Sequence, residues 1–194
     1  MLLSTLKQFN WLDIFVLILL LRIGYVAMRS EFFLELFKFL GTILAIFLSL
    51  HYYIIFSDYI GSHIGVNNIP LEYLTSVISI VLGFLGYFIF VVLRKVFYRF
   101  MKMEAVPNLN KWGAVILGLS RGALAASLMI FIMVTSPFGY LKDSVSHAYS
   151  GKYIFKIAPA VYGSLWDGIA SKFISRDKFN KAILDAPKNL EAGK

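Results

Sequence analysis

The fold of this chain is decided by the stretch YLTSVISIVLGFLGYFIFVVL, residues 73–93, which contains no Asp, Glu, Lys or Arg. At about 1.5 Å per residue, a helix of this length spans about 30 Å, the thickness of the hydrocarbon core of a bilayer. Backbone groups in lipid must be satisfied internally, so only helices and closed barrels cross membranes. The stretch lacks the alternating pattern of barrel strands. We therefore predict a transmembrane helix.

Three further apolar stretches are long enough to cross a bilayer, and they cover residues 11–28, 32–56 and 112–134. Arg22 interrupts the first of them, and Arg121 is the one charge of the last. Together with residues 73–93 they predict an all-α, polytopic membrane protein, with a bundle of four transmembrane helices in residues 1–135.

Composition excludes a soluble domain. Of the 194 residues, 59% are apolar and 15% are charged, whereas soluble domains are about half apolar and about one quarter charged. A soluble fold of this size has too large a surface relative to its volume to bury so much apolar area. The chain has no cysteine, which excludes disulfides, thiolate metal sites and a cysteine nucleophile.

Lysine and arginine are distributed unequally between the predicted loops. The segment 57–72 has none, whereas the segment 94–111 has five: Arg94, Lys95, Arg99, Lys102 and Lys111. Cytoplasmic loops are enriched in Lys and Arg, so we predict that 94–111 is cytoplasmic and that both termini are extracytoplasmic. Nine Lys and Arg from Lys142 onward oppose this orientation, but the rule is weak for long tails. The same placement explains the net charge of +8 without nucleic acid as a partner.

Residues 136–194 are predicted to be a C-terminal extramembrane segment with an amphipathic helix over about 153–175. Its apolar residues recur at spacings of three and four: Ile154, Ile157, Ala158, Val161, Leu165, Ile169 and Phe173. Such a stripe fits a helix lying on the membrane surface and equally a helix packed on the bundle. Both alternatives remain open at this stage.

Charges inside the membrane are the first candidates for function, because each costs at least about 2.5 kcal/mol there. Arg121 is nine residues past Trp112 and therefore about 13 Å into the bilayer, whereas Arg22 is closer to a helix end, from which it can reach the surface. Candidate carboxylate partners are Asp13, Glu31 and Glu35. Arg121 therefore fixes helix packing through a buried pair, or it lines a polar pathway.

Small residues four apart, Ala114, Gly118, Gly122 and Ala126, lie on one face of the last predicted helix. Such a face allows close helix approach. The partner is left open between the helix 73–93, which has two glycines, and another subunit.

Catalytic patterns are missing from the sequence. Its three histidines share no metal-ligand spacing, and its glycines form no nucleotide-binding motif. Ser144 and His147 are close in sequence, but such a pair needs an orienting acid to be catalytic. We expect no enzyme activity, and no catalytic, cofactor or metal site.

Short motifs follow one another in a fixed order along the chain: NWLD at 10–13, GYVAMRSEF at 24–32, EL at 35–36, LNKWG at 109–113, and RG at 121–122. With this order the chain resembles the colicin V production protein (CvpA) family over about residues 8–160. Ser30 stands where that family commonly has glycine.

This resemblance implies a bacterial inner-membrane protein with a role in colicin V (toxin) production or export and in envelope homeostasis, without an established biochemical activity. Some family members are similar in their membrane part to anchors of extracytoplasmic proteases. We therefore expect a non-enzymatic protein whose partners are the lipid bilayer and other envelope proteins, with a second copy of the chain among the possible partners. The alternatives are a small oligomeric transporter or channel that uses Arg121, and an anchor or regulator of an extracytoplasmic protease. The candidate functional or packing residues are Asp13, Arg22, Arg29, Glu35, Gly118, Arg121 and Gly122.

Overall fold

The computed structural model describes residues 10–63, 70–100, 108–173 and 178–183, and within these residues it contains helices and turns but no strand. The four long helices are α2 (Trp11–Met28), α3 (Phe32–His63), α4 (Leu71–Phe100) and α5 (Ala114–Thr135), the last preceded by a π-helical turn (Leu109–Gly113). All four are long and apolar enough to cross a membrane. The predicted all-α polytopic fold is confirmed.

Two of the helices are longer than the apolar pattern indicated. α3 continues past residue 56 to His63, and α4 continues past residue 93 to Phe100. Polar residues such as Asp58 and Arg94 end an apolar run, but they do not interrupt backbone hydrogen bonding. The helices therefore extend beyond the hydrophobic stretches.

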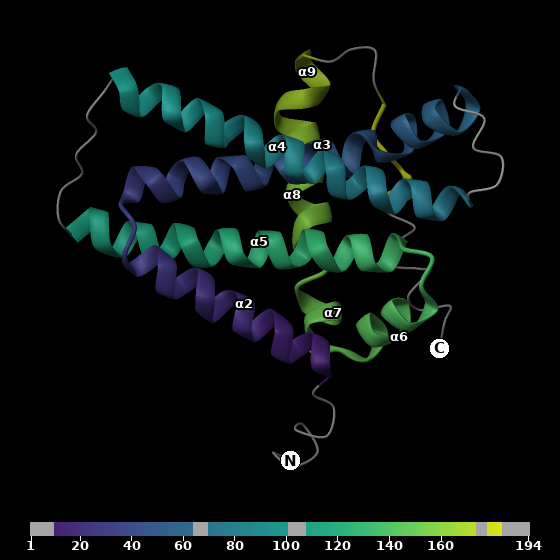
Figure 1. Ribbon diagram of the computed structural model, residues 1–194, viewed down its shortest axis with the longest axis horizontal. Coiled ribbons are helices and arrows are strands. Elements are labelled where there is room, and N and C mark those ends of the chain that lie inside the picture. The colour runs from purple at the N-terminus through teal and green to yellow at the C-terminus, as the bar shows by residue number, and fades with distance from the viewer. Residues whose placement is uncertain (1–9, 64–69, 101–107, 174–177, 184–194) are drawn as a thin grey trace.

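The long helices pack in the spatial order α2, α5, α3, α4 (Figure 1). α3 and α4 form an antiparallel pair in close contact, whereas α5 lies between α3 and α2. The two helices approach each other closely at Gly86, where a Cβ atom would lie 2.7 Å from the Ala45 Cα atom. Gly86 therefore serves the α3–α4 contact and not the contact with α5.

The C-terminal part forms short helices that cross the direction of the long ones (Figure 1). These are α6 (Gly139–His147), α7 (Tyr149–Tyr153), α8 (Ile157–Leu165), a π-helical turn (Trp166–Ala170) and α9 (Ser171–Phe173). The region predicted as one helix over 153–175 is thus divided by the turn at 154–156. Pro159 lies in the first turn of α8, where its missing N–H costs nothing.

The buried face of this segment differs from the predicted stripe. Ala158, Tyr162, Trp166 and Ala170 are buried, whereas Ile169 is 57% exposed and Phe173, in the same stripe, is 82% exposed. The π-helical turn changes the register, and ring contacts of Tyr162 and Trp166 with α3 select the aromatic face. α8 packs on the bundle. The domain boundary at 135/136 and the extramembrane position of the segment stay predictions.

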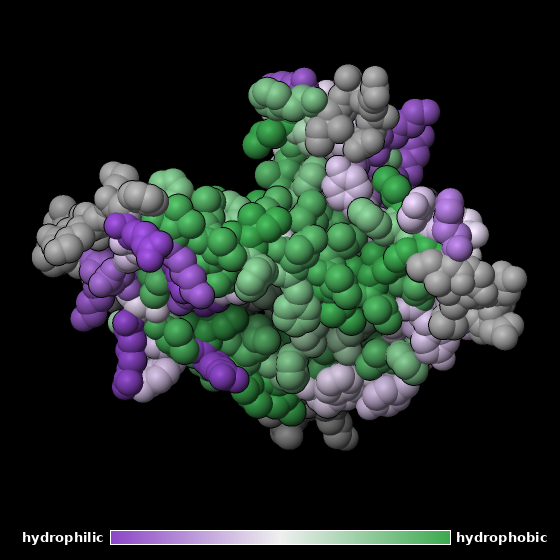
Figure 2. Space-filling view, turned by 45° about the horizontal axis from the view of Figure 1, so that its top comes forward, coloured by the Kyte–Doolittle hydropathy of each residue, from purple (hydrophilic) through white to green (hydrophobic). Residues whose placement is uncertain are grey.

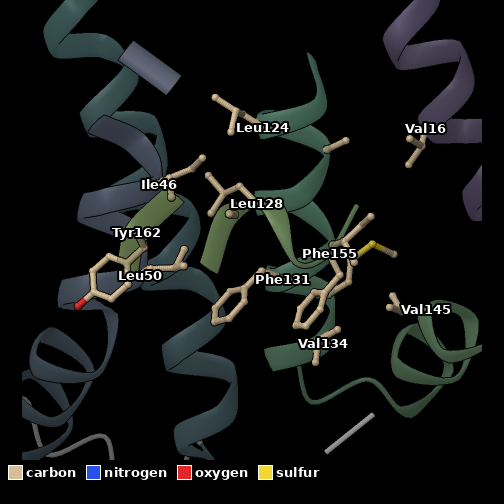
Figure 3. Close-up of a cluster of buried hydrophobic side chains, with 14 of the residues drawn as sticks. Val16, Ile46, Leu50, Leu124, Leu128, Phe131, Val134, Val145, Phe155 and Tyr162 are labelled. Atoms are coloured by element: carbon tan, nitrogen blue, oxygen red, sulfur yellow. The ribbon is translucent and has the colours of Figure 1, made fainter. Parts of the chain in front are cut away.

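The apolar core lies where this segment meets the long helices (Figure 3). The Phe131 ring of α5 stacks on the Phe155 ring, with centroids 6.1 Å apart. The Ser127 hydroxyl donates to the Phe155 carbonyl at 3.0 Å and accepts the Ala158 N–H at 2.7 Å. Backbone groups at the start of α8 are thereby satisfied inside the core, as burial requires.

We predict that Gly86→Ala destabilises the protein and that Gly83→Ala, on the same helix, does not. The Gly86 Cβ would displace the α3 backbone, at a cost of about 1–3 kcal/mol, whereas the Gly83 Cβ meets a Leu128 methyl at 3.7 Å. Both changes improve helix propensity equally. The measurement is the unfolding midpoint of each variant in detergent. Equal midpoints for the two variants would contradict the close α3–α4 approach.

Candidate functional site

A cluster of three charged side chains lies within the helix bundle. Glu35 of α3 is completely buried, and its Oε1 atom is 2.5 Å from the Lys38 Nζ atom. Its Oε2 atom is 3.2 Å from the Arg121 Nη2 atom of α5. Of the three carboxylates considered for Arg121, the structure selects Glu35.

The local geometry brings these groups to the same depth. Glu35 lies in the first turn of α3, where the helix dipole favours a negative charge. Helical side chains point toward the N-terminus of their helix, so Arg121 extends toward the beginning of α5. The Phe32 N–H donates to the Asn110 Oδ1 atom at 2.6 Å, and this bond fixes the start of α3 against the turn before α5.

Among the described residues, some polar atoms of this charged cluster have no hydrogen-bond partner. Within the described part of the chain, Glu35 Oε2 and Arg121 Nε make no hydrogen bond, although Oε2 is within ion-pair distance of Arg121 Nη2. The contact is therefore an ion pair without the two parallel bonds of a bidentate arrangement. One buried carboxylate balances part of the charge of two cations.

Gly118 and Gly122 lie where α2 crosses α5. A Cβ atom at Gly118 would overlap the Cβ atom of Ala27, and one at Gly122 would lie 3.0 Å from the Leu20 Cδ2 atom. The structure therefore gives α2 as the partner of this small-residue face, which is neither of the two partners considered from the sequence, the helix 73–93 or another subunit. The Gly118 position is also 3.7 Å from Glu35 Oε2, so the close approach adjoins the ion cluster.

The other candidates lie apart from the cluster. Asp13 is buried and accepts both the backbone N–H and the hydroxyl of Ser150, each at 2.7 Å. It also caps α2 through the N–H of Asn10, and so it connects the start of α2 to α7. Arg22 is exposed on α2. The exposed guanidinium of Arg29 lies 4.6 Å from the Tyr25 ring centroid.

A buried polar contact that the sequence did not indicate joins α3 to α8. The Nδ1 atom of His51 lies 2.8 Å from the Tyr162 hydroxyl, which also accepts the Asn180 N–H at 3.2 Å. Burial raises the pKa of the Tyr162 hydroxyl, so this group stays protonated and polar. The His51 ring stacks on Trp166 with centroids 5.1 Å apart. No spacing rule links residues more than 100 positions apart.

The residues weighed for catalysis are separated by their contacts. The Ser144 hydroxyl accepts the Trp11 indole N–H at 3.0 Å. The exposed His147 contacts Asp143 and Ser146 of its own helix. Across the described ranges, no group of three or more His, Cys, Asp or Glu could hold a metal ion.

An apolar groove of about 640 Å³ runs between α4 and α5. Its walls are made by side chains from residues 73–87 and 121–136, and Thr42 and Ala45 of α3 also line it. Arg121 lines one end of the groove, so the same side chain belongs to the ion cluster and to the groove wall. We call this space the α4–α5 groove.

We predict that Glu35→Gln costs about 3–5 kcal/mol of unfolding free energy, because it leaves buried cations without a counter-charge. Arg121→Gln should cost less, since Glu35 keeps Lys38. The double variant should lose less than the sum of the two, which is the sign of direct coupling. The exposed Arg22→Gln serves as the control, with a change within about 0.5 kcal/mol. Unfolding curves in detergent measure the unfolding free energy of all four variants. If the loss in the double variant equals the sum of the two single losses, direct pairing of Glu35 with Arg121 is contradicted.

Comparison with known proteins identifies the family. Residues 12–159 match the family described as colicin V production protein, over most of the 194-residue chain. No curated protein and no solved structure matches the chain. The matched range includes the four long helices, the ion cluster and the start of α8. The chain belongs to the colicin V production protein family.

Proposed function

We propose that this protein supports colicin V production or secretion, and envelope integrity, without catalysing a reaction, by binding other envelope proteins within the membrane. The observation that carries the proposal is the internal pairing of Arg121 with Glu35. Arg121 is 13% exposed and Glu35 is fully buried, so the deep charge is engaged in holding α3 to α5. Family membership supports the connection to toxin production.

We propose the bacterial inner membrane as the location, with the basic end of the bundle in the cytoplasm. Arg94, Lys95 and Arg99 lie at the end of α4, and Lys111 lies next to the start of α5. Figure 2 shows hydrophilic side chains gathered at this end and hydrophobic ones over the middle of the molecule. Because Lys and Arg are enriched on the cytoplasmic side of membrane proteins, we propose that both termini are extracytoplasmic.

Single-cysteine labelling of intact cells tests this orientation in the cysteine-free chain. Glu72, in the first turn of α4, and Lys111, just before α5, are exposed, and the starts of these two helices lie at opposite ends of the bundle (Figure 1). We expect that a membrane-impermeant thiol reagent labels Glu72→Cys and not Lys111→Cys, and that permeabilisation makes both reactive. Labelling of Lys111→Cys alone in intact cells would reverse the orientation.

Photo-crosslinking in intact cells tests for partners. A photoreactive residue at Tyr140, which is 69% exposed on α6, or at Phe84, which is 73% exposed on α4, should yield a discrete adduct with another envelope protein. Glu35→Gln should weaken both that adduct and toxin release, because it loosens the bundle. An adduct with an extracytoplasmic protease would favour the anchor alternative. Toxin release that persists while every adduct is lost would contradict the proposal.

Transport is the second candidate function, and the position of Arg121 on the groove wall favours it. A pathway residue in an oligomer would pass ions or anionic solutes along that wall. Reconstituted vesicles separate the two functions. Flux through the wild type that is lost in a folded Arg121→Gln variant supports transport, whereas no flux in the wild type supports the binding role.

A further inference from the structure

Three cations lie together at the end of α4. Arg94, Lys95 and Arg99 line a surface pocket of about 520 Å³ together with Leu34 and Tyr98. The Tyr98 hydroxyl donates to the Glu31 Oε2 atom at 3.4 Å. Three positively charged side chains therefore line one pocket, and no acidic residue is among its described lining residues. The pocket attracts an anion.

The basic pocket and the α4–α5 groove follow one seam of the fold. Tyr87 lines both the groove and a crevice beside it that is too narrow for a water molecule, and Arg94 lines both this crevice and the basic pocket. Along α3 the same seam passes from Leu34 through Lys38 to Thr42 and on toward the groove. Residues at spacings of three and four share one helix face. A polar end and an apolar end thus lie in line along the bundle.

The dimensions of the groove suit a flexible hydrocarbon chain. Its α4 wall extends over residues 73–87, which is about 21 Å of helical rise. The volume of the groove is about 640 Å³. Pockets of about 300–1,000 Å³ hold small molecules. The length and volume of the groove therefore suit a lipid tail.

We propose that this seam binds one anionic phospholipid from the leaflet at the basic end of the bundle. The phosphate lies between Arg94, Lys95 and Arg99, and one acyl chain extends past Tyr87 toward the groove. Basic pockets between transmembrane helices commonly bind anionic headgroups. The glycerol backbone lies over the crevice, where Lys38 is already paired with Glu35. This site stands independently of the proposed function and of the orientation in the cell.

The test measures lipid retained by the full chain. Purified protein is equilibrated in nanodiscs of phosphatidylethanolamine with a minority of phosphatidylglycerol, and bound lipid is counted by native mass spectrometry after release into detergent. We expect preferential retention of one phosphatidylglycerol. If the two lipids are retained in the same ratio as they have in the nanodiscs, the proposal is overturned.

Two charge-matched double variants separate a defined site from general surface attraction. Arg94→Gln with Lys95→Gln removes two cations of the pocket and should weaken phosphatidylglycerol retention by at least about tenfold, since surface cations each contribute appreciably to anionic lipid binding. Arg29→Gln with Lys111→Gln removes two exposed cations, one at the end of α2 and one just before α5. These helix ends lie at the same end of the bundle as the end of α4 (Figure 1), and this double variant should leave retention unchanged. Equal losses in both doubles would reduce the effect to membrane-surface electrostatics and overturn the site.

A second pair of variants tests the acyl chain. Ala125 lines the groove and is half-buried, so Ala125→Phe fills it. Ile116 is on the same helix and is 64% exposed, so Ile116→Phe changes a lipid-facing position outside the groove. We expect that Ala125→Phe lowers phosphatidylglycerol retention several-fold while Ile116→Phe does not. Full retention in a folded Ala125→Phe protein would overturn acyl-chain binding in the groove, whether or not the basic pocket holds a headgroup.

Discussion

A buried carboxylate that faces two cations sets the arrangement of three of the four long helices. In hydrocarbon a charged side chain is stable only with a counter-charge or internal hydrogen bonds, and Glu35 supplies the counter-charge to Arg121 across the α3–α5 interface. The pair requires α3 and α5 to keep their register. It also lies beside Gly118, so α2 can approach α5 closely at Ala27 without displacing the carboxylate.

The second constraint is the return of the chain across the bundle after α5. Three polar contacts hold it, and each joins residues far apart in the sequence: Asp13 with Ser150, Ser127 with Ala158, and His51 with Tyr162. Each satisfies a group that burial would otherwise leave without a partner, which is costly in an apolar environment. The C-terminal segment is therefore part of the folded core and not an appendage attached to it.

The sequence predicts the parts of this structure that depend on local physics. Hydropathy and helical rise give four helices, and the depth of Arg121 requires a buried partner. The spacing of Gly118 and Gly122 predicts close helix approach. The identities of the partners are tertiary facts. The sequence offered Asp13, Glu31 and Glu35 as partners of Arg121 without choosing among them. It did not indicate α2 as the helix against the glycines.

The errors at element level have a similar cause. Charges such as Arg94 mark the end of an apolar stretch but not the end of α4, because a helix needs only backbone hydrogen bonds to continue. The predicted stripe that ends at Phe173 was defined by apolar residues alone. The fold instead buried Tyr162 and Trp166, whose rings contact His51. The hydrophobicity pattern of a single sequence carries no information about ring contacts between residues that are distant in the chain.

The divergence of α4 from α5 is explained by the positions of the contacts that α4 makes. Close packing at Gly86 and Ala45 holds α4 to α3. Near the end of α5, the Ser76 hydroxyl of α4 lies 3.4 Å from the Thr135 carbonyl. Just past α5, the Phe138 ring meets the Tyr73 ring edge-on, with centroids 5.7 Å apart. Away from that end the two helices diverge (Figure 1), which leaves the groove. Because Arg121 forms part of its wall, whatever fills the groove lies against the ion pair that joins α3 to α5.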